Sequence, residues 1–350
     1  MAKHKNLLER LSKSSFPPAA ILGAFTSFFT TAFKNQSASG KESPQEASLV
    51  KIAFSEPQRT SSPVRLEREY SRTLILGAAN SAHPFRRSLS GIAVGPADSI
   101  FALGDEEIRV FAPDGKMVRS WRAPEGALCF TVDPGERVYF GLAGRVEIHS
   151  ASGTRMGGFA TTESNHPARI TAIRISGQEI LIADAEARLI RRYDRNGRQL
   201  GTIGAHGKIR GFMLPNRSLD FDVDAKGVIR AADPGRHRVS SWRSDGSPVG
   251  SYGKFGLANP EDFVGCCNPV NLAIAPDGSV ITAEKVAARV KVYAPDGRLL
   301  ALIGPEHFDP KCVHMHLAAD SKGRILVADP VRREVKVFSP LTRAGVSKSV

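Results

Sequence analysis

The chain has 350 residues, of which 41% are hydrophobic and 24% are charged, and this composition is that of a folded globular protein. The formal net charge of +13 favours anionic partners such as nucleic acid, acidic lipid headgroups or acidic proteins, without selecting among them. Four cysteines in a chain of this length exclude a disulfide-rich scaffold and leave room for one or two bridges or one metal site.

Residues 1–34 have the order of a signal sequence or an N-terminal membrane anchor. A basic start precedes an uncharged run from Ser14 to Phe33, which Lys34 ends. The run approaches the ~20 residues that span a bilayer, although Pro17 and Pro18 weaken it. The basic start predicts that the remainder lies outside the cytoplasm, in the periplasm if the protein is bacterial. The alternative is an apolar tail without a targeting role.

Residues 35–71 are rich in Ser, Glu, Lys and Pro and lack a periodic apolar pattern, which predicts a disordered tether. From residue 72 the chain repeats. Turn pairs recur at Asp114-Gly115, Ser152-Gly153, Asn196-Gly197, Asp245-Gly246 and Asp296-Gly297, at spacings of 38, 44, 49 and 51 residues. Each pair follows a strand with alternating apolar residues, and an apolar stretch, a turn and a second apolar stretch lie upstream.

Four short strands per unit, at this period, predict the blades of an all-β propeller. Six units can be counted, and the last one lacks its outer strand. An isolated strand at Arg72–Gly77 precedes the first unit, and we expect it to complete the sixth blade and to close the ring. The propeller is therefore assigned to residues 72–342, and residues 343–350 to a flexible tail.

Two units carry the pattern of a known repeat: "GVIRAADPGRHRVSSWRSDG" (227–246) and "GRILVADPVRREVKVFSP" (323–340). Glycine, an apolar run, Ala-Asp, a basic spacer and an alternating strand resemble the NHL repeat. The resemblance implies a six-bladed β-propeller and, by itself, no activity. Members of this family include RNA-binding and protein-binding platforms, and a peptide-amidating lyase has the same fold.

Long loops between blades are expected on one face, which we call the loop face. It carries the connections from each outer strand to the next inner strand and the turns between second and third strands. The long connections are 204–218, 253–269 and 304–315, all in the second half of the ring. They predict a binding surface over blades four to six.

Cysteines and histidines end two of these loops. A site for Zn²⁺, copper or iron would use Cys266, Cys267, Cys312, His314 and His316, with His237 as a further donor. A disulfide between Cys312 and one of the adjacent cysteines, or a vicinal bridge, is the second interpretation. A thiolate nucleophile with a histidine base and Asn268 or Glu284 as orienting group is the third. Plain packing is the fourth, and it is expected for Cys129.

Further ligand contacts are predicted from the same loops and turns. They are Asn268, Glu284, Lys285, Arg236, His237 and Asp233, and blade five is notable because Glu284-Lys285 replaces the Asp of the repeat. The Asp residues of the other blades (Asp184, Asp233, Asp329) are expected to brace the following turn through backbone N–H groups.

The sequence thus predicts a non-catalytic propeller that binds a protein or a small ligand outside the cytoplasm, at a Cys/His-rich site that takes a transition metal or exchanges electrons. A propeller-type metal-dependent hydrolase or lyase is the alternative. An RNA platform is a further alternative, through a basic stripe formed by Arg188, Arg191, Arg192, Arg195, Arg198, Arg236 and Arg238. Few aromatic residues lie near these arginines, so stacking platforms for bases are poor.

Overall fold

A computed structural model describes residues 66–161 and 167–341, which belong to one compact unit, 62–350. The predicted signal or anchor segment, most of the tether and the C-terminal tail lie outside these residues. Within the described ranges, no helix combines the length and the apolar character needed to cross a bilayer.

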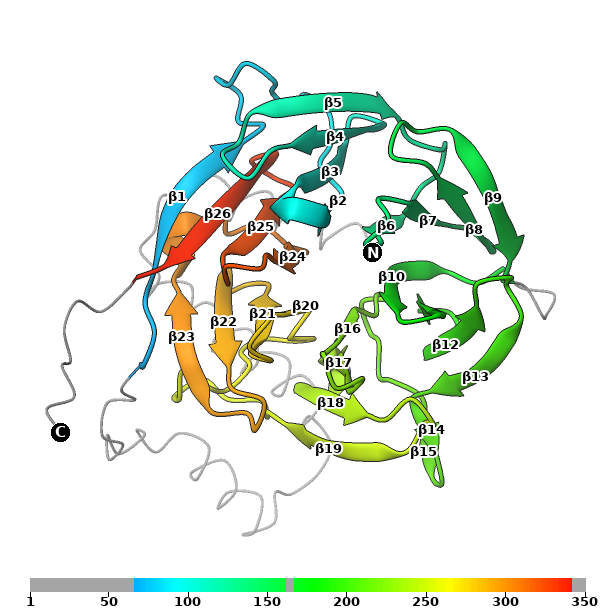
Figure 1. The fold of residues 1–350 in the computed structure, drawn as a ribbon. Coiled ribbons are helices and arrows are strands. Elements are labelled where there is room, and N and C mark those ends of the chain that lie inside the picture. The colour runs from blue at the N-terminus through cyan, green and yellow to red at the C-terminus, as the bar shows by residue number, and fades with distance from the viewer. Residues whose placement is uncertain (1–65, 162–166, 342–350) are drawn as a thin grey trace, which may run out of the picture. The chain divides into compact units, whose positions relative to one another are not determined.

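The described residues form six four-stranded antiparallel sheets arranged as blades around a central axis (Figure 1). The first two blades are β2 (Gly91–Val94), β3 (Ile100–Gly104), β4 (Glu107–Phe111), β5 (Met117–Arg122), and β6 (Cys129–Val132), β7 (Val138–Leu142), β8 (Arg145–His149), β9 (Arg155–Ala160). Blades three and four are β10 (Ile170–Ser176), β11 (Glu179–Asp184), β12 (Leu189–Asp194), β13 (Gln199–Ile203), and β16 (Phe221–Val223), β17 (Ile229–Asp233), β18 (Arg238–Trp242), β19 (Pro248–Tyr252).

Blade five is β20 (Asn271–Ile274), β21 (Val280–Glu284), β22 (Arg289–Tyr293) and β23 (Leu299–Ile303). Blade six is β24 (His316–Ala319), β25 (Ile325–Asp329), β26 (Glu334–Pro340) and β1 (Tyr70–Leu76). A small hairpin of β14 (Ala205–His206) and β15 (Ile209–Arg210) extends from the loop after blade three. The short 3₁₀ turns are η1 (Pro96–Asp98), η2 (Pro234–Arg236) and η3 (Pro305–His307).

The predicted closure of the ring is confirmed. Strand β1 pairs antiparallel with β26, with Leu76 opposite Val335 and Ile75 opposite Lys336. The N-terminal strand therefore completes the blade that the C-terminal strands begin, and Figure 1 shows the two ends of the propeller side by side. The strand starts at Tyr70, two residues before the predicted start. Pairing removes an open sheet edge that would otherwise be free to pair with another chain.

The core is divided among six buried clusters, each between two neighbouring blades. Second strands are buried on both faces, as in β7 and β25, and this explains why the sequence shows short continuous apolar runs there. The outer strand β5 alternates, because one face is covered and the other is solvated.

The recurrent turn glycines have a packing reason. Gly297 adopts φ +95°, and a Cβ there would lie 2.5 Å from Cγ of Tyr252 on the outer strand of the preceding blade. Gly153 has φ +89° and stands in the same relation to Trp121. Each turn packs against the preceding blade, so the repeat requires glycine for both backbone conformation and space.

Candidate functional site

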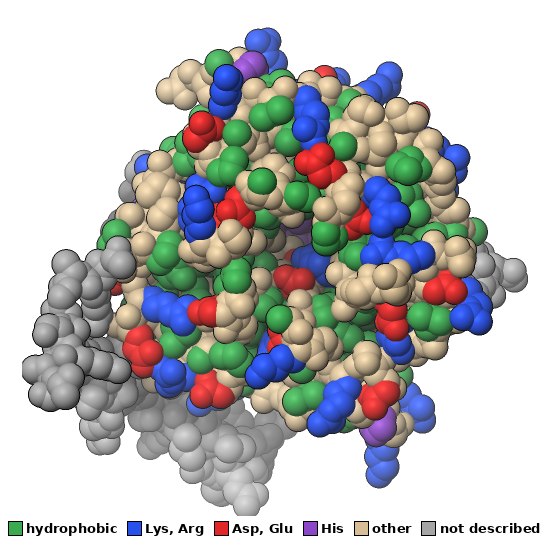
Figure 2. Space-filling model, in the orientation of Figure 1, with side chains coloured by type: hydrophobic (Ala, Val, Ile, Leu, Met, Phe, Trp, Pro, Cys, Tyr) green, Lys and Arg blue, Asp and Glu red, His purple; other side chains and the backbone are tan. Residues whose placement is uncertain are grey.

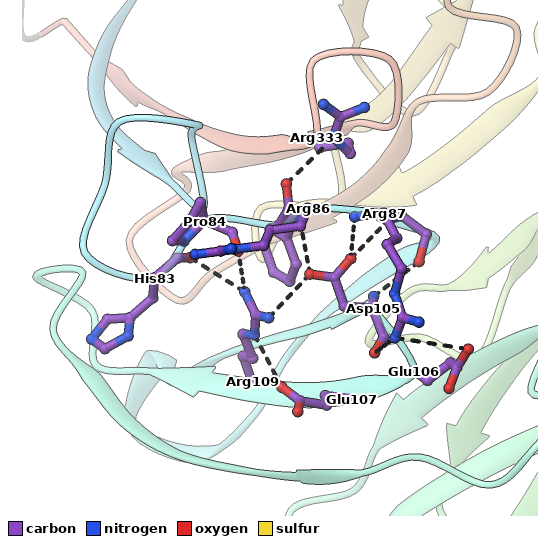
Figure 3. A network of polar contacts seen from close by, with 11 residues as sticks. His83, Pro84, Arg86, Arg87, Asp105, Glu106, Glu107, Arg109 and Arg333 are labelled. Carbon is purple, nitrogen blue, oxygen red and sulfur yellow. Dashed lines mark hydrogen bonds and ion pairs between the residues drawn. The ribbon is translucent and has the colours of Figure 1, made fainter.

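Buried acidic side chains attach the loop face to the blades. Asp105, directly after β3, accepts hydrogen bonds from the backbone N–H groups of Arg86, Arg87 and Ser88 at 2.8, 2.6 and 2.9 Å. Arg109 donates to the same carboxylate at 3.1 Å and to the carbonyl of Pro84 at 2.9 Å (Figure 3). Burial disfavours the charge of Asp105, but these N–H groups and Arg109 outweigh it and lower its pKa.

Equivalent acids fix the loops of four other blades, and the predicted bracing of the following turn is confirmed for Asp184 and Asp329. Each one ends a second strand, and they are Asp184, Asp233, Glu284 and Asp329. Asp233 accepts from the N–H of Met213, Glu284 from Val264 and Asp329 from Asp309, so each carboxylate holds the incoming loop. Asp184 and Asp329 also accept bonds from the turn that follows them.

Glu284 and Asp233 were predicted to contact ligand, but their geometry is that of supports. Glu284 is 0% exposed and Asp233 is 1% exposed, and their oxygens accept bonds from the protein. In blade five the carboxylate of Glu284 lies 2.6 Å from the ammonium of Lys291, whose side chain is equally buried. Burial lowers the pKa of Lys291 to about 8, although Glu284 opposes the shift.

The inner strands place a row of polar side chains at the loop-face end of the central channel. Asn271 lies opposite Ala283, and His316 lies opposite Ala328. The carbonyl of Asp220 accepts from Ala232, the matching position of blade four. Gly91 and Cys129 fill the same position in blades one and two. One side of the channel mouth is therefore polar, and the other is small or apolar.

A charged network that includes two residues of this row, Asp220 and Asn271, joins blades three, four and five. Arg174 donates to Asp222 at 3.1 Å and to Asp220 at 3.3 Å. Asp220 also accepts from the side-chain amide of Asn271 at 3.0 Å. One cation thus serves two carboxylates. Burial raises the pKa of Asp222, and the charge of Arg174 opposes that rise. The Oδ1 of Asn271 is buried and has no hydrogen-bond partner among the described residues.

Two histidines complete the channel mouth. Burial lowers the pKa of His316 to about 4, and His314 and Arg174 add to the shift while Asp220 opposes it. Burial and the charge of Lys285 also lower the pKa of His314. Both imidazoles are therefore neutral near pH 7, a state in which a ring nitrogen can accept a proton or a hydrogen bond.

The space at this point is small. The hollow that Asp220, Arg174 and His316 line has a volume of about 20 Å³, close to that of a single water. Ser90 lines this hollow and also a second pocket of about 260 Å³ between Glu106, Arg122 and Glu125, on the loop face of blades one and two. Figure 2 shows one face of the ring hollowed at its centre, with acidic, basic and histidine side chains visible inside.

The adjacent cysteines lie in the loop that leads into blade five. Their Sγ atoms are 3.2 Å apart, Cys266 is exposed and Cys267 is buried. Asn268 is fully buried and binds this loop to the turn after β21: its side chain donates to the carbonyl of Lys285 at 3.0 Å and accepts from the N–H of Lys285 at 2.9 Å. Asn268 is thus a structural residue, and Lys285 is held beside the cysteines.

Cys312 does not join the adjacent pair. Its thiol donates to Asp329 at 3.0 Å inside the core between blades five and six. Burial and Asp329 raise its pKa to about 12. All four cysteines are free thiols. Within residues 66–161 and 167–341, no group of three or more Cys, His, Asp or Glu side chains converges to hold a metal ion, so the predicted ligands are not brought together.

Exposed apolar side chains gather on the loop face of the second half of the ring. They are Met213, Phe255, Leu257, Val286 and Val313, between 46% and 69% exposed. Phe255 contacts the ring of His237 at 5.3 Å, and the Nε2 of His237 bonds the carbonyl of Gly265 at 2.9 Å. A Cβ on Gly265 would lie 3.6 Å from Val286. These contacts join the loop 253–269 to the turns after β17 and β21, and they place Phe255 and Val286 on connected segments.

We call this set, with the basic residues Lys254, Lys285 and Lys311 of the same loops and turns, the apolar–basic surface. By contrast, the arginines of the predicted RNA-binding stripe are mostly paired with acids. Arg192 binds Glu179, Arg198 binds Asp194, and Arg236 and Arg238 both bind Asp233. A guanidinium group that is already paired with a carboxylate is a poorer phosphate ligand. The arginine stripe is therefore a weaker RNA-binding surface than the sequence predicts.

Arg174, Asp220, Asp222 and Asn271 were not predicted from the sequence as site residues. A signal for Asp220 and Asn271 was present, because aligning the starts of the inner strands places polar residues in three blades where two others have Gly or Cys. Arg174 lies in the seven-residue strand β10, whose register shifts between Ile170 and Ala172, and this bulge obscures its position.

Comparisons with known proteins show the fold. No protein-family model matches the sequence, and no curated protein matches it. A Bacteroides thetaiotaomicron protein of unknown function is similar at a TM-score of 0.60 and 14% identity, over 79% of this chain and 77% of that one. A streptogramin B lyase is similar at 0.55 and 10%, over 78% and 98%. The virginiamycin B lyase of Staphylococcus aureus is similar at 0.50 and 11%, over 77% and 99%.

Proposed function

We propose that this propeller is a protein-binding module whose working surface is the apolar–basic surface on the loop face of blades four to six. The observation that carries the proposal is that the loops and turns of this face expose Met213, Phe255, Leu257, Val286 and Val313, each at least 46% exposed. Exposed apolar groups that lie together among polar ones mark interaction sites, and Met and aromatic residues are enriched at interface centres.

The loops that carry this surface are anchored to the blades beneath it. Asp233, Glu284 and Asp329 hold the three loops through backbone N–H groups, so the loops are ordered before a partner arrives. Ordering in advance reduces the entropy lost on binding. The basic residues among the apolar ones favour a partner that presents acidic side chains next to apolar ones.

The test compares two double variants of the full chain. Phe255→Ser with Leu257→Ser removes apolar groups that are 55% and 69% exposed from the surface. Val118→Ser with Val249→Ser is the matched control, because these valines are 57% and 48% exposed on outer strands. Partners retained from the native host are compared by quantitative mass spectrometry, and the affinity of each is then measured with purified components. We expect the first variant to lose at least tenfold in affinity for a partner that the control binds normally. Equal affinities of both variants for every partner would refute the proposal.

A lyase is the second candidate, and the two neutral histidines at the channel mouth favour it. A structure of a catalytically inactive histidine-to-alanine variant of the virginiamycin B lyase holds quinupristin, and its fold is similar to this one at a TM-score of 0.50. His316 or His314 could take a proton from a bound substrate. The hollow of about 20 Å³ beside His316 is too small for such a molecule, so the substrate would lie above the channel.

Incubation of the protein with quinupristin, followed by mass spectrometry, tests this candidate. Conversion that disappears in His316→Ala or His314→Ala, and persists in the control variant His83→Ala, would support a lyase. Unchanged quinupristin after prolonged incubation with folded protein would argue against this substrate and favour the binding module.

A further inference from the structure

We propose that Cys266 and Cys267 form a reversible dithiol–disulfide couple that closes by exchange with a small disulfide. Their Sγ atoms are 3.2 Å apart. A disulfide bond is about 2.05 Å long, so closure requires the sulfurs to approach by roughly 1 Å. The other two thiols are held elsewhere: Cys312 donates to Asp329, and Cys129 is buried between blades two and three.

The two thiols differ in the way that a two-step exchange requires. Cys266 is exposed and can reach a disulfide in solution, whereas Cys267 is only 8% exposed and lies behind it. Burial and the contact with Cys266 raise the pKa of Cys267, and the ammonium of Lys285 acts in the opposite direction. Cys266 is therefore the attacking thiol, and Cys267 is the resolving thiol, whose thiolate Lys285 favours.

The backbone already carries a sharp turn at this point. Cys267 has φ +66° and Gly265 has φ +69°, both in the left-handed region. Adjacent Cα atoms are about 3.8 Å apart, less than the ~4.4 to 6.8 Å that disulfides usually span. A vicinal bridge is consequently strained, and strained bridges are reduced more easily than structural ones. This spacing favours a couple that opens and closes over a permanent staple.

The exchange balances with a low-molecular-weight disulfide, RSSR, as the oxidant. The thiolate of Cys266 attacks one sulfur of RSSR, a Cys266–SR mixed disulfide forms, and one RS⁻ leaves. The thiolate of Cys267 then attacks the Sγ of Cys266 and displaces the second RS⁻. The two protons of the cysteine thiols end on the two RS⁻ groups. The pair loses two electrons, RSSR is reduced to two RSH, and excess thiol reverses both steps.

The couple is also placed to act on the apolar–basic surface, and this part of the inference rests on the proposed function. The carbonyl of Gly265, next to Cys266, accepts from His237, whose ring contacts Phe255. Asn268, next to Cys267, is bonded to both backbone groups of Lys285. The Cys266–Cys267 bridge lies in the chain between the anchored residues Gly265 and Asn268, so its closure shifts the backbone that positions Phe255 and Lys285.

The full chain, equilibrated with oxidised glutathione and then with dithiothreitol, tests the couple by thiol alkylation, intact mass and peptide mapping. We expect the oxidised protein to lose two alkylatable thiols and the mass of two hydrogen atoms, with Cys266 and Cys267 joined within one peptide. Dithiothreitol should restore both thiols. In Cys267→Ser, the glutathione adduct on Cys266 should persist because the resolving thiol is missing, and Cys266→Ser should remain unmodified.

Retention of all four thiols in wild-type protein at every glutathione ratio would overturn the proposal, as would pairing of Cys266 with Cys312 or with a second chain. This result needs no variant, so it stands even where a substitution impairs folding. Partner affinity, measured with reduced and oxidised protein, reports separately on the surface. Equal affinities would remove the link to the surface and leave the couple intact, and absence of any partner would refute only the binding module.

Discussion

The ammonium of Lys291 lies 2.6 Å from Oε1 of Glu284, and both side chains are 0% exposed. Lys291 also donates to the carbonyl of Asp262 at 2.6 Å and lies 4.6 Å from the centre of the Phe263 ring. Glu284 in turn accepts from the N–H of Val264. This pair therefore fastens the loop that carries Phe255 and the adjacent cysteines to blade five.

Replacing Glu284 by Gln should leave the Lys291 ammonium buried without a counter-ion. We expect the free energy of unfolding to fall by about 3–5 kcal/mol, the usual cost of breaking a buried pair from one side. Denaturant unfolding measures it. Glu67→Gln is the control, because Glu67 pairs with Arg298 in solvent, with side chains 55% and 54% exposed, and such pairs contribute about 0–1 kcal/mol. Similar losses in both variants would show that the buried pair contributes no more to the free energy of unfolding than the exposed pair does.

The bracing acids predict a loss of stability in acid. Burial disfavours the charge of Asp329, but the N–H of Arg332, the thiol of Cys312 and the ammonium of Lys336 lower its pKa below the ordinary 3.8. The unfolded state then binds the proton first as pH falls, so the contribution is complete above pH 3.8 and is lost as pH passes through the folded pKa.

Unfolding measured from pH 7 to pH 2 should therefore show a stability difference between wild type and Asp329→Asn that is large at neutral pH. The difference should shrink below about pH 4. A difference independent of pH would mean that the charge of Asp329 does not contribute.

His316 should stay neutral far below the pH at which free histidine titrates. Burial lowers its pKa from 6.5 to about 4, so the folded state resists protonation, and stability from this group is lost as pH falls from 6.5 towards 4. Titration of the imidazole signals by NMR measures the pKa, with the spectrum of His316→Gln to assign the resonance. A midpoint near 6.5 would show that the channel mouth is open to water.

The stability that β1 gives to the closed ring should come mainly from the side chains on its buried face. Leu76 is 4% exposed in the core between blades six and one, whereas its neighbour Ile75 is 37% exposed on the same strand. Leu76→Ala should reduce the free energy of unfolding by about 2–5 kcal/mol, the cost of a core cavity. Ile75→Ala should change it by about 0.5 kcal/mol or less. Thermal and denaturant unfolding of both variants compare them, and equal losses would contradict the observed register.

Much of the architecture was readable from local patterns. The turn pairs, the alternating strands and the isolated N-terminal strand predicted six blades and their closure, and the pairing of Leu76 with Val335 confirms it. The bracing of the following turn by Asp184 and Asp329 was also predicted, since an Asx side chain before a turn bonds nearby N–H groups whatever the fold around it. Asp233 instead accepts from the N–H of Met213 in the incoming loop. The positions of the long loops followed from the same repeat.

The site was less predictable, because its contacts join residues far apart in the sequence. Cys312 and Cys266 end neighbouring loops, yet the thiol of Cys312 faces Asp329. Glu284 departs from the repeat, yet it takes the place of the usual aspartate. Arg174 meets Asp220 and Asp222 only because the inner strands of blades three and four lie side by side at the channel.

The sequence by itself determined the blade repeat, the ring closure and the face on which the long loops lie, since these depend on alternation and turn chemistry along the chain. Only the tertiary structure decided which polar groups meet at the channel, which thiols lie side by side and which apolar side chains stay in solvent. These depend on how each blade is rotated against its neighbours, and no local pattern encodes that rotation.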